Sequence, residues 1–230
     1  MDARDRVDAL RAYETETSSC ERCALAGGRT QVVFGSGNPD ADLMLVGEAP
    51  GFHEDRQGVP FVGQAGQLLD RLLGGIGLER ADVYVCNTLK CRPPGNRDPL
   101  EEEIAACEPH LFRQIELVRP RVVATLGNFA TKLLSGRPHG ITRVHGQPQE
   151  VTLGISRVLL YPLYHPAAAL YTPSMLSVLE EDFARVPELL RRPAAEVAST
   201  PPRAADLVTA EAEQAELIAL EAAAVQLGLF

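Results

Sequence analysis

The sequence predicts an α/β domain built around a mainly parallel sheet. Short apolar runs of strand length alternate with longer segments whose apolar residues recur at helical spacing. Most of these runs contain few polar positions, as expected for strands that helices cover on both faces. The chain has 230 residues, of which 45% are hydrophobic and 23% charged, so it has room for one good-sized domain and an appendage.

The elements follow one another in a regular order. We expect strands at 31–34, 43–46, 83–87, 121–126 and 158–163. We expect helices at 2–16, 65–76, from Pro99 onward, 127–134 and 174–190. The first is amphipathic. The third begins with Pro99 and Leu100, and the three glutamates that follow suit the positive end of a helix dipole.

Three irregular segments begin where predicted strands end. They are the loops at 47–63, 87–98 and 164–171. In parallel sheets, ligands bind at the carboxyl ends of the strands. The three loops are therefore expected to converge on one site.

Composition and charge exclude some classes of protein. No apolar run approaches 18 residues, so no membrane span is expected, and the charged N-terminus lacks a signal-peptide core. We therefore expect a cytoplasmic protein. The net charge is −9, but the segment 193–230 contributes −5 of it, so a local cationic face remains possible within 1–192. Residues 193–208 are typical of a disordered linker, and a helix is expected at about 209–225.

The five cysteines indicate a metal site. An odd number of cysteines in a cytoplasmic chain argues against a disulfide framework. Cys20 and Cys23 form a compact chelating pair, and Cys91 and Cys107 would complete a set of four thiolates. Zinc and an iron–sulfur cluster are both chemically possible, and a redox pair or scattered buried thiols are the alternatives. Cys86, within a predicted strand, is expected in the core.

Four motifs follow one another in the chain together with the four cysteines: G-E-A-P-G at 47–51, P-F-V-G-Q-A-G at 60–66, N-T-L-K-C-R-P-P-G-N-R at 87–97 and H-P-A-A-A-L at 165–170. In this order and with these cysteines, the chain resembles the family 4 uracil-DNA glycosylases, which carry a [4Fe-4S] cluster. The resemblance spans about residues 20–190. It implies a three-layer α/β/α fold over 1–192, a cluster held by Cys20, Cys23, Cys91 and Cys107, and hydrolytic removal of uracil from DNA.

The resemblance also assigns the residues that contact the base. Phe61 would stack on the extruded uracil, and the Asn87 amide would read its O4 and N3 edge. His165 would donate a hydrogen bond to O2, where negative charge grows as the glycosidic bond breaks.

The carboxylate roles follow from the same motifs. Ala49 occupies the place where classical family 1 enzymes carry a water-activating aspartate. Glu48 then becomes the candidate carboxylate for ordering water or the pocket. Glu54 falls where the family lines the C5 side of uracil, which would help to exclude the thymine methyl group.

Five further residues are candidates for contact with the DNA backbone. They are Lys90, Arg92, Arg97, Arg143 and His145. A relative of the family traps DNA covalently through a histidine that would fall between Asn87 and Cys107. This sequence has no histidine there, so turnover is expected.

The last five residues, Gln226–Phe230, resemble the pentapeptide with which bacterial proteins bind the sliding clamp. Gln226, Leu227, Leu229 and Phe230 would make the contact, on an acidic leash formed by 193–225. The alternative is that the apolar side chains attach the last helix to the core. The enzyme itself is expected to be a monomer.

Two other functions fit parts of the pattern. One is a non-enzymatic DNA-binding module that uses an iron–sulfur cluster as its scaffold and associates with the replication machinery. The other is a glycosylase that accepts a broader range of deaminated bases. The complete set of Phe61, Asn87 and His165 favours the uracil-specific enzyme, because a binding module needs no pocket that reads a base.

Overall fold

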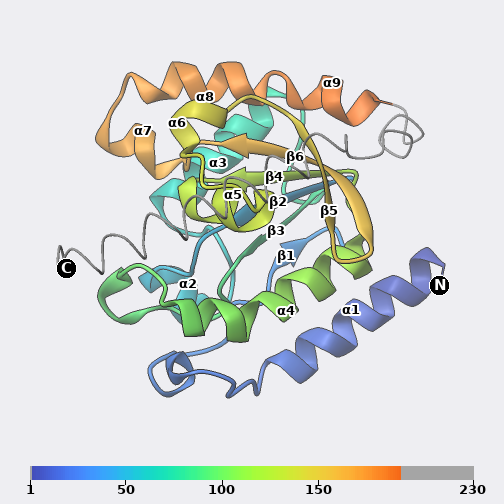
Figure 1. The fold of residues 1–230 in the computed structure, drawn as a ribbon, viewed down its shortest axis with the longest axis vertical. Coiled ribbons are helices and arrows are strands. Elements are labelled where there is room, and N and C mark those ends of the chain that lie inside the picture. The colour runs from blue at the N-terminus through green and yellow to red at the C-terminus, as the bar shows by residue number, and fades with distance from the viewer. Residues whose placement is uncertain (1, 193–230) are drawn as a thin grey trace, which may run out of the picture. The chain divides into compact units, whose positions relative to one another are not determined.

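The computed structural model describes residues 2–192, which form an α/β/α domain (Figure 1). The strands are β1 (Ser36–Gly37), β2 (Leu43–Gly47), β3 (Val83–Asn87), β4 (Val122–Leu126), β5 (Gln149–Leu153) and β6 (Ser156–Leu163). The α-helices are α1 (Ala3–Thr17), α2 (Phe52–Gln57), α3 (Gln64–Gly75), α4 (Glu101–Val118), α5 (Asn128–Ser135), α6 (Ile141–Val144), α7 (Ala167–Tyr171), α8 (Met175–Phe183) and α9 (Val186–Arg191). Two 3₁₀ turns, η1 (Ala24–Gly27) and η2 (Pro94–Asn96), lie in the loops.

The six strands form one sheet in the order β1-β3-β2-β4-β6-β5. The four central strands are parallel, and the two edge strands pair antiparallel to their neighbours. The predicted α/β class with a mainly parallel sheet is confirmed. The register pairs Gly47 at the end of β2 with Asn87 at the end of β3, which places these two residues side by side.

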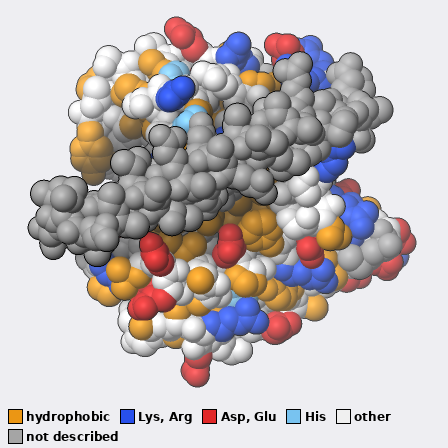
Figure 2. Space-filling view, viewed as in Figure 1, with side chains coloured by type: hydrophobic (Ala, Val, Ile, Leu, Met, Phe, Trp, Pro, Cys, Tyr) orange, Lys and Arg blue, Asp and Glu red, His pale blue; other side chains and the backbone are white. Residues whose placement is uncertain are grey.

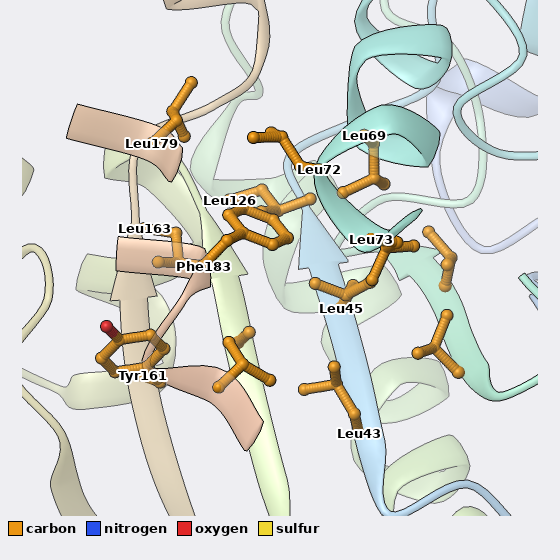
Figure 3. Close-up of a cluster of buried hydrophobic side chains, with 14 of the residues drawn as sticks. Leu43, Leu45, Leu69, Leu72, Leu73, Leu126, Tyr161, Leu163, Leu179 and Phe183 are labelled. Atoms are coloured by element: carbon orange, nitrogen blue, oxygen red, sulfur yellow. The ribbon is translucent and has the colours of Figure 1, made fainter. Parts of the chain in front are cut away.

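Alternate residues of the strands face two separate hydrophobic layers. Leu43 and Leu45 of β2 point toward α3, α8 and α9, where Leu69 and Phe183 pack (Figure 3). Met44 and Val46 point to the opposite layer, formed with α1, α4 and α5. In Figure 1, α3, α8 and α9 lie on one side of the sheet, and α1 and α4 on the other. The three-layer arrangement is therefore confirmed, and Cys86 lies buried in the second layer as expected.

Two predicted elements are wrong in detail. The segment 31–34 is not a strand, although Val33 and Phe34 are buried. The carbonyl of Phe34 accepts a hydrogen bond from the side chain of Gln114 at 2.8 Å, so a helix side chain satisfies a group that a neighbouring strand would otherwise bind. The predicted helix at 174–190 is divided into α8 and α9 because Pro187, in the first turn of α9, lacks an N–H to continue α8.

The structure adds five helices and strands that the sequence analysis did not predict. They are the helix α2 inside the loop 47–63, the helix α7 inside the loop 164–171, the short helix α6, and the edge strands β1 and β5. The predicted linker at 193–208, the predicted helix at 209–225 and the motif Gln226–Phe230 lie outside the described residues.

Candidate functional site

A pocket of about 470 Å³ opens at the carboxyl ends of β2 and β3. Residues from all three predicted loops line it, so the expected convergence is confirmed. The lining residues are Glu48, Ala49, Pro50, Gly51, Glu54, Phe61, Gly63, Gln64, Ala65, Asn87, Pro93, Asn96, Arg97, His165 and Ala167. Every residue that the sequence analysis assigned to the base pocket is among them.

Gly47 brings Phe61 and Asn87 together. A Cβ atom on Gly47 would lie 2.4 Å from Oδ1 of Asn87 and 2.7 Å from Cζ of Phe61. These distances are far below normal contact, so only glycine lets both side chains pack against the end of β2. The ring and the amide consequently form adjoining parts of the pocket wall.

Asn87 carries a polar group whose hydrogen-bonding capacity is unused. The residue is 2% exposed, and no hydrogen bond between residues 2–192 uses its amide. Its amide atoms are not among the fully buried side-chain atoms of this part of the chain that lack a partner, so the amide keeps its access to the pocket. An unpartnered amide facing a pocket is therefore well suited to bind a polar ligand.

His165 is held as a neutral imidazole. Its Nδ1 accepts the N–H of Ala167 at 3.1 Å, which leaves the ring proton on Nε2. Burial lowers its pKa from 6.5 to about 4, with an opposing effect from Glu54. The ring lies against that of Phe61, with centroids 5.5 Å apart. Gly127, at φ +99°, packs closely against His165. A Cβ on Gly127 would lie 3.2 Å from Cβ of His165, so glycine provides space for the His165 side chain.

The two carboxylates of the pocket differ in their surroundings. Burial raises the pKa of Glu48, and the charge of Asp98 adds to the effect. The carboxylate of Glu54 accepts the N–H groups of Val62 and Gly63 at 3.2 and 3.3 Å. Glu54 therefore lines the pocket and also holds the loop that carries Phe61.

A second, smaller cavity gathers the four predicted ligand cysteines, Cys20, Cys23, Cys91 and Cys107. Within residues 2–192, no three Cys, His, Asp or Glu side chains lie close enough together to hold a metal ion directly. The donor set nevertheless fits a larger group with several metal atoms, because four thiols converge on one cavity from three different segments of the chain. Cys86 lies elsewhere, in the core.

N–H groups point at two of the four sulfurs, and a histidine ring nitrogen lies against a third. The backbone N–H of Lys90 donates to Sγ of Cys107 at 3.2 Å, and Arg29 approaches Sγ of Cys91 at 3.6 Å. Nε2 of His110 lies 3.3 Å from Sγ of Cys20, while its Nδ1 pairs with the hydroxyl of Tyr13. Donors of this kind stabilise thiolate ligands and tune iron–sulfur clusters. The sequence analysis missed His110, although its position three residues after Cys107 on α4 placed it on the same helix face.

The structure contradicts the expectation that Lys90 faces phosphates. Its side chain is 1% exposed, and Nζ donates to the main-chain carbonyl of Asn87 at 2.6 Å. Arg97 lies at the pocket but forms a bidentate pair with the buried carboxylate of Glu103, at 2.9 and 2.6 Å. That pairing lowers the pKa of Glu103 and occupies both terminal nitrogens of Arg97.

Two of the three remaining candidate DNA contacts, Arg92 and His145, have partners that orient them. The Arg92 guanidinium lies 5.2 Å from the centre of the half-exposed Phe52 ring. Nδ1 of His145 pairs with the Asp182 carboxylate at 2.8 Å, and Arg143 is exposed two residues before it. On the described part of the face in Figure 2, basic and acidic side chains are interspersed, so the cations form no single large patch there.

No helix within residues 2–192 is long and apolar enough to cross a membrane.

Comparison with known proteins gives a consistent result. A profile described as the uracil DNA glycosylase superfamily matches residues 34–190. The type-4 uracil-DNA glycosylase of Sulfurisphaera tokodaii is 45% identical over 192 residues, which cover 81% of this chain and 87% of that protein. The type-4 enzyme of Saccharolobus solfataricus is 47% identical, and the alignment covers 80% of this chain and 88% of that protein. The type-4 enzyme of Archaeoglobus fulgidus is 46% identical, and the alignment covers 80% of this chain and 94% of that protein. The chain therefore belongs to the uracil DNA glycosylase superfamily and, within it, to the type-4 uracil-DNA glycosylases.

Proposed function

We propose that this protein is a uracil-DNA glycosylase, which takes uracil out of the DNA stack and hydrolyses its N-glycosidic bond. The product is an abasic site for base excision repair. One observation carries the proposal beyond family membership. An aromatic ring (Phe61), an unpartnered buried amide (Asn87) and a neutral imidazole (His165) line one pocket. Each supplies a different kind of contact to a flipped base.

Recognition of the base is assigned to Phe61 and Asn87. The Phe61 ring stacks on the plane of the pyrimidine, and the Asn87 amide donates to O4 while accepting from N3–H. Cytosine presents the reverse pattern of donor and acceptor, so it would leave buried polar groups unpaired and be rejected. Glu54, which lines the same pocket, is assigned to the C5 side of the base.

Bond cleavage is assigned to His165 and Glu48. As the bond between N1 and C1′ breaks, its electron pair moves into the base and negative charge grows on O2. The Nε2–H of the neutral His165 donates to that oxygen. The sugar becomes cationic, and the Glu48 carboxylate stabilises it and orders the water whose oxygen forms the new bond to C1′. The proton that this water loses neutralises the departing uracil anion, so the products are the abasic sugar and free uracil. Ala49 offers no second carboxylate, so stabilisation of the leaving group carries more of the rate.

A base-release assay tests the proposed reaction. Duplex oligonucleotides containing uracil, hypoxanthine or ethenocytosine are incubated with wild-type protein, Asn87→Ala and His165→Ala. His139→Ala is the matched control, since His139 lies outside the pocket. Release of uracil by wild type and the control, with large losses in the two pocket variants and no strand cleavage, is expected. Binding without base release would support the non-enzymatic module, and equal release of hypoxanthine would support the broader glycosylase.

The proposed cofactor is a [4Fe-4S] cluster held by Cys20, Cys23, Cys91 and Cys107. The spread of the four thiols over one cavity suits a cluster better than a single zinc ion. The group would supply structural cross-linking, because it ties the segment after α1 to the loop after β3 and to α4.

Iron and acid-labile sulfide are measured together with absorbance in the thiolate-to-iron region. Cys107→Ser should lose iron, whereas Cys86→Ser, a buried cysteine outside the cavity, should keep it. Stoichiometric zinc without sulfide would contradict the proposal.

The finer contacts with partners are also proposals. We propose that the DNA backbone is bound by Arg92, Arg97, Arg143 and His145. The enzyme itself is proposed to be monomeric and cytoplasmic. Gln226, Leu227, Leu229 and Phe230 are proposed to bind the sliding clamp. Deletion of 226–230 should abolish co-elution with the clamp and leave activity on naked oligonucleotide intact. Equal co-elution after the deletion would refute the clamp proposal.

A further inference from the structure

Phe61 adopts an unusual backbone conformation at the pocket wall. Its φ is +56°, in the left-handed region that residues other than glycine, asparagine and aspartate rarely adopt. Such a conformation persists only where the surroundings impose it. The ring is 6% exposed and packs on Gly47 and His165, so the strained backbone fixes the surface that receives the base.

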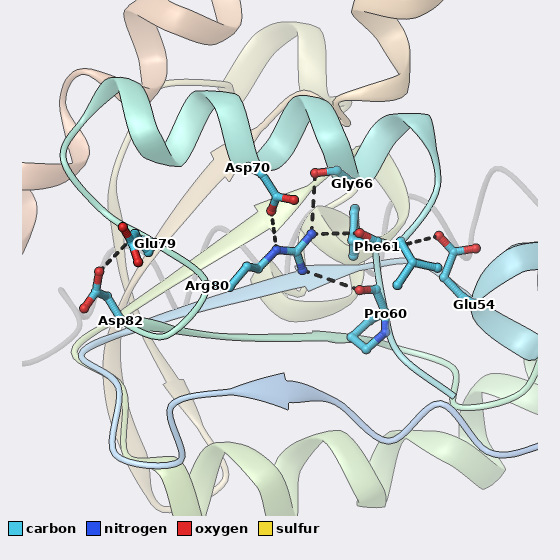
Figure 4. Close-up of polar contacts among 9 residues, drawn as sticks. Glu54, Pro60, Phe61, Gly66, Asp70, Glu79, Arg80 and Asp82 are labelled. Carbon is cyan, nitrogen blue, oxygen red and sulfur yellow. Dashed lines mark hydrogen bonds and ion pairs between the residues drawn. The ribbon is translucent and has the colours of Figure 1, made fainter. Parts of the chain in front are cut away.

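Arg80, which lies between α3 and β3, binds the backbone on one side of this loop. Its Nη2 donates to the carbonyl of Phe61 at 2.7 Å and approaches that of Gly66 at 3.5 Å, and its Nη1 approaches the carbonyl of Pro60 at 3.4 Å. Nε pairs with the carboxylate of Asp70 on α3. Figure 4 shows the guanidinium inserted between α3 and the loop.

Glu54 binds the opposite side of the same loop. Its Oε1 accepts the N–H groups of Val62 and Gly63 (Figure 4). The peptide groups around Phe61 therefore lie between a cation that binds carbonyls and an anion that binds N–H groups. A Cβ on Gly66 would lie 1.7 Å from the carbonyl oxygen of Phe61, so glycine is required for α3 to approach this closely.

Arg80 does not itself face the ligand. Within the described chain it is not among the residues that line the pocket, and it borders a separate surface depression beside Pro60 and Phe61. Its influence on a bound base runs through the backbone that it binds, and its shortest contact there is with the carbonyl of Phe61. The planar guanidinium serves several carbonyls and a carboxylate together, which a lysine ammonium cannot do with the same geometry.

We propose that Arg80 is a positioning residue for base recognition. By binding the carbonyl of Phe61, it holds the Phe61 ring in the orientation that stacks on the flipped base. The inference rests on the proposed function, because it assigns Phe61 to uracil. Without Arg80, the Phe61 backbone relaxes toward negative φ and the ring moves off Gly47.

The predicted effect falls on binding more than on the chemical step. Stacking is made in the ground state and retained in the transition state, so its loss raises KM and leaves kcat nearly unchanged. A base stacked on an aromatic ring gains enough affinity that loss of the correct orientation weakens binding about tenfold. The inhibition constant of free uracil should rise by the same factor, because free uracil needs the ring but not the DNA contacts.

The test compares Arg80→Lys with Arg71→Lys, an exposed arginine on α3 that takes no part in this network. For each protein, KM and kcat on uracil-containing oligonucleotide, the inhibition constant of uracil and the melting temperature are measured. We expect Arg80→Lys to raise KM and the inhibition constant together by about tenfold, with kcat within threefold, and Arg71→Lys to resemble wild type. In a Phe61→Ala background, Arg80→Lys should produce no further change in the inhibition constant.

Four outcomes would overturn the inference. The first is an unchanged inhibition constant in Arg80→Lys, even with a lowered melting temperature, because that indicates a purely structural role. The second is a full additional effect in the Phe61→Ala background, because Arg80 would then act by another route. If Arg80→Lys does not fold, Asp70→Asn replaces it: a rise of about threefold in the inhibition constant is expected, and no rise refutes the inference. A wild-type protein that releases no uracil would instead refute the proposed function, and this inference with it.

Discussion

The protonation state of His165 gives a prediction that can be followed through pH. Nδ1 accepts the N–H of Ala167, and burial lowers the pKa of the ring from 6.5 to about 4. A shift of this size corresponds to roughly 3 kcal/mol against the charged imidazolium. We therefore expect His165 to act as a neutral donor at every pH above about 5.

The size of the catalytic effect follows from that role. A single donor to a developing oxyanion contributes about 100- to 1,000-fold to kcat. His165→Ala should lower the single-turnover rate of base release by about that factor, with little change in KM, because the hydrogen bond strengthens mainly in the transition state.

Rates measured between pH 4.5 and 9 distinguish the neutral ring from a charged one. The wild-type rate should not fall as the pH rises through 6.5. A fall at acidic pH that persists in His165→Ala is assigned to Glu48, whose pKa is raised, and should disappear in Glu48→Gln. A wild-type rate that declines between pH 6 and 7.5, with no such decline in His165→Ala, would show a working imidazolium and refute the reasoning.

The same shift affects stability, with a definite sign. The pKa of His165 is lower in the folded state than in the unfolded chain, so the unfolded chain binds more protons between pH 6.5 and about 4. Folding stability contributed by this group should fall as the pH decreases through that window. Urea unfolding of wild type and His165→Gln at pH 7 and 4.5 should show a larger loss for wild type, by at most about 3 kcal/mol.

Three further predictions concern a pocket glycine, two cationic side chains and the absence of a covalent adduct. Gly47→Ala should weaken uracil binding at least tenfold, because the new Cβ would clash with the side chains of Asn87 and Phe61. In the control Gly74→Ala, the new Cβ has no atom within 4 Å, so uracil should bind normally. The inhibition constant of free uracil measures both effects. Lys90→Met should leave the salt dependence of DNA binding unchanged, while Arg92→Ala should reduce its slope by about one; an equal reduction in both would place Lys90 at a phosphate after all. Uracil-containing oligonucleotide should give no adduct on a denaturing gel, and a stable adduct would contradict turnover.

The sequence predicted the strands best where a continuous apolar run corresponds to a strand that is buried on both faces. The apolar runs that became β2, β3, β4 and β6 are buried on both faces, so their periodicity matched their environment. The edge strand β5 was missed because its residues alternate between partial and full exposure, with only Leu153 buried. The turn glycine at 154, with φ +59°, was the available signal for that hairpin.

The site was less predictable where long-range contacts decide what a side chain does. Lys90 looked available to phosphate because it stands in a cationic loop, but the fold turns it inward to the carbonyl of Asn87. Arg80 carried no signal in sequence, since its partners at Pro60, Phe61 and Gly66 lie in another loop. Residue type and spacing indicate which chemistry is present, whereas the partner of a long cationic side chain depends on tertiary structure.

The order of the cysteines along the chain has a consequence for biosynthesis. A ribosome delivers the chain from its N-terminus, so all four thiols of the cavity are present once Cys107 has emerged. The base pocket must wait for His165, which follows β6 near the end of the domain. The ligands of the proposed cluster are therefore complete on a nascent chain that is not yet able to bind DNA productively. If the cluster forms as proposed, a cell short of iron would release a chain whose defect precedes completion of the pocket, so its quality control would meet that chain before the genome does.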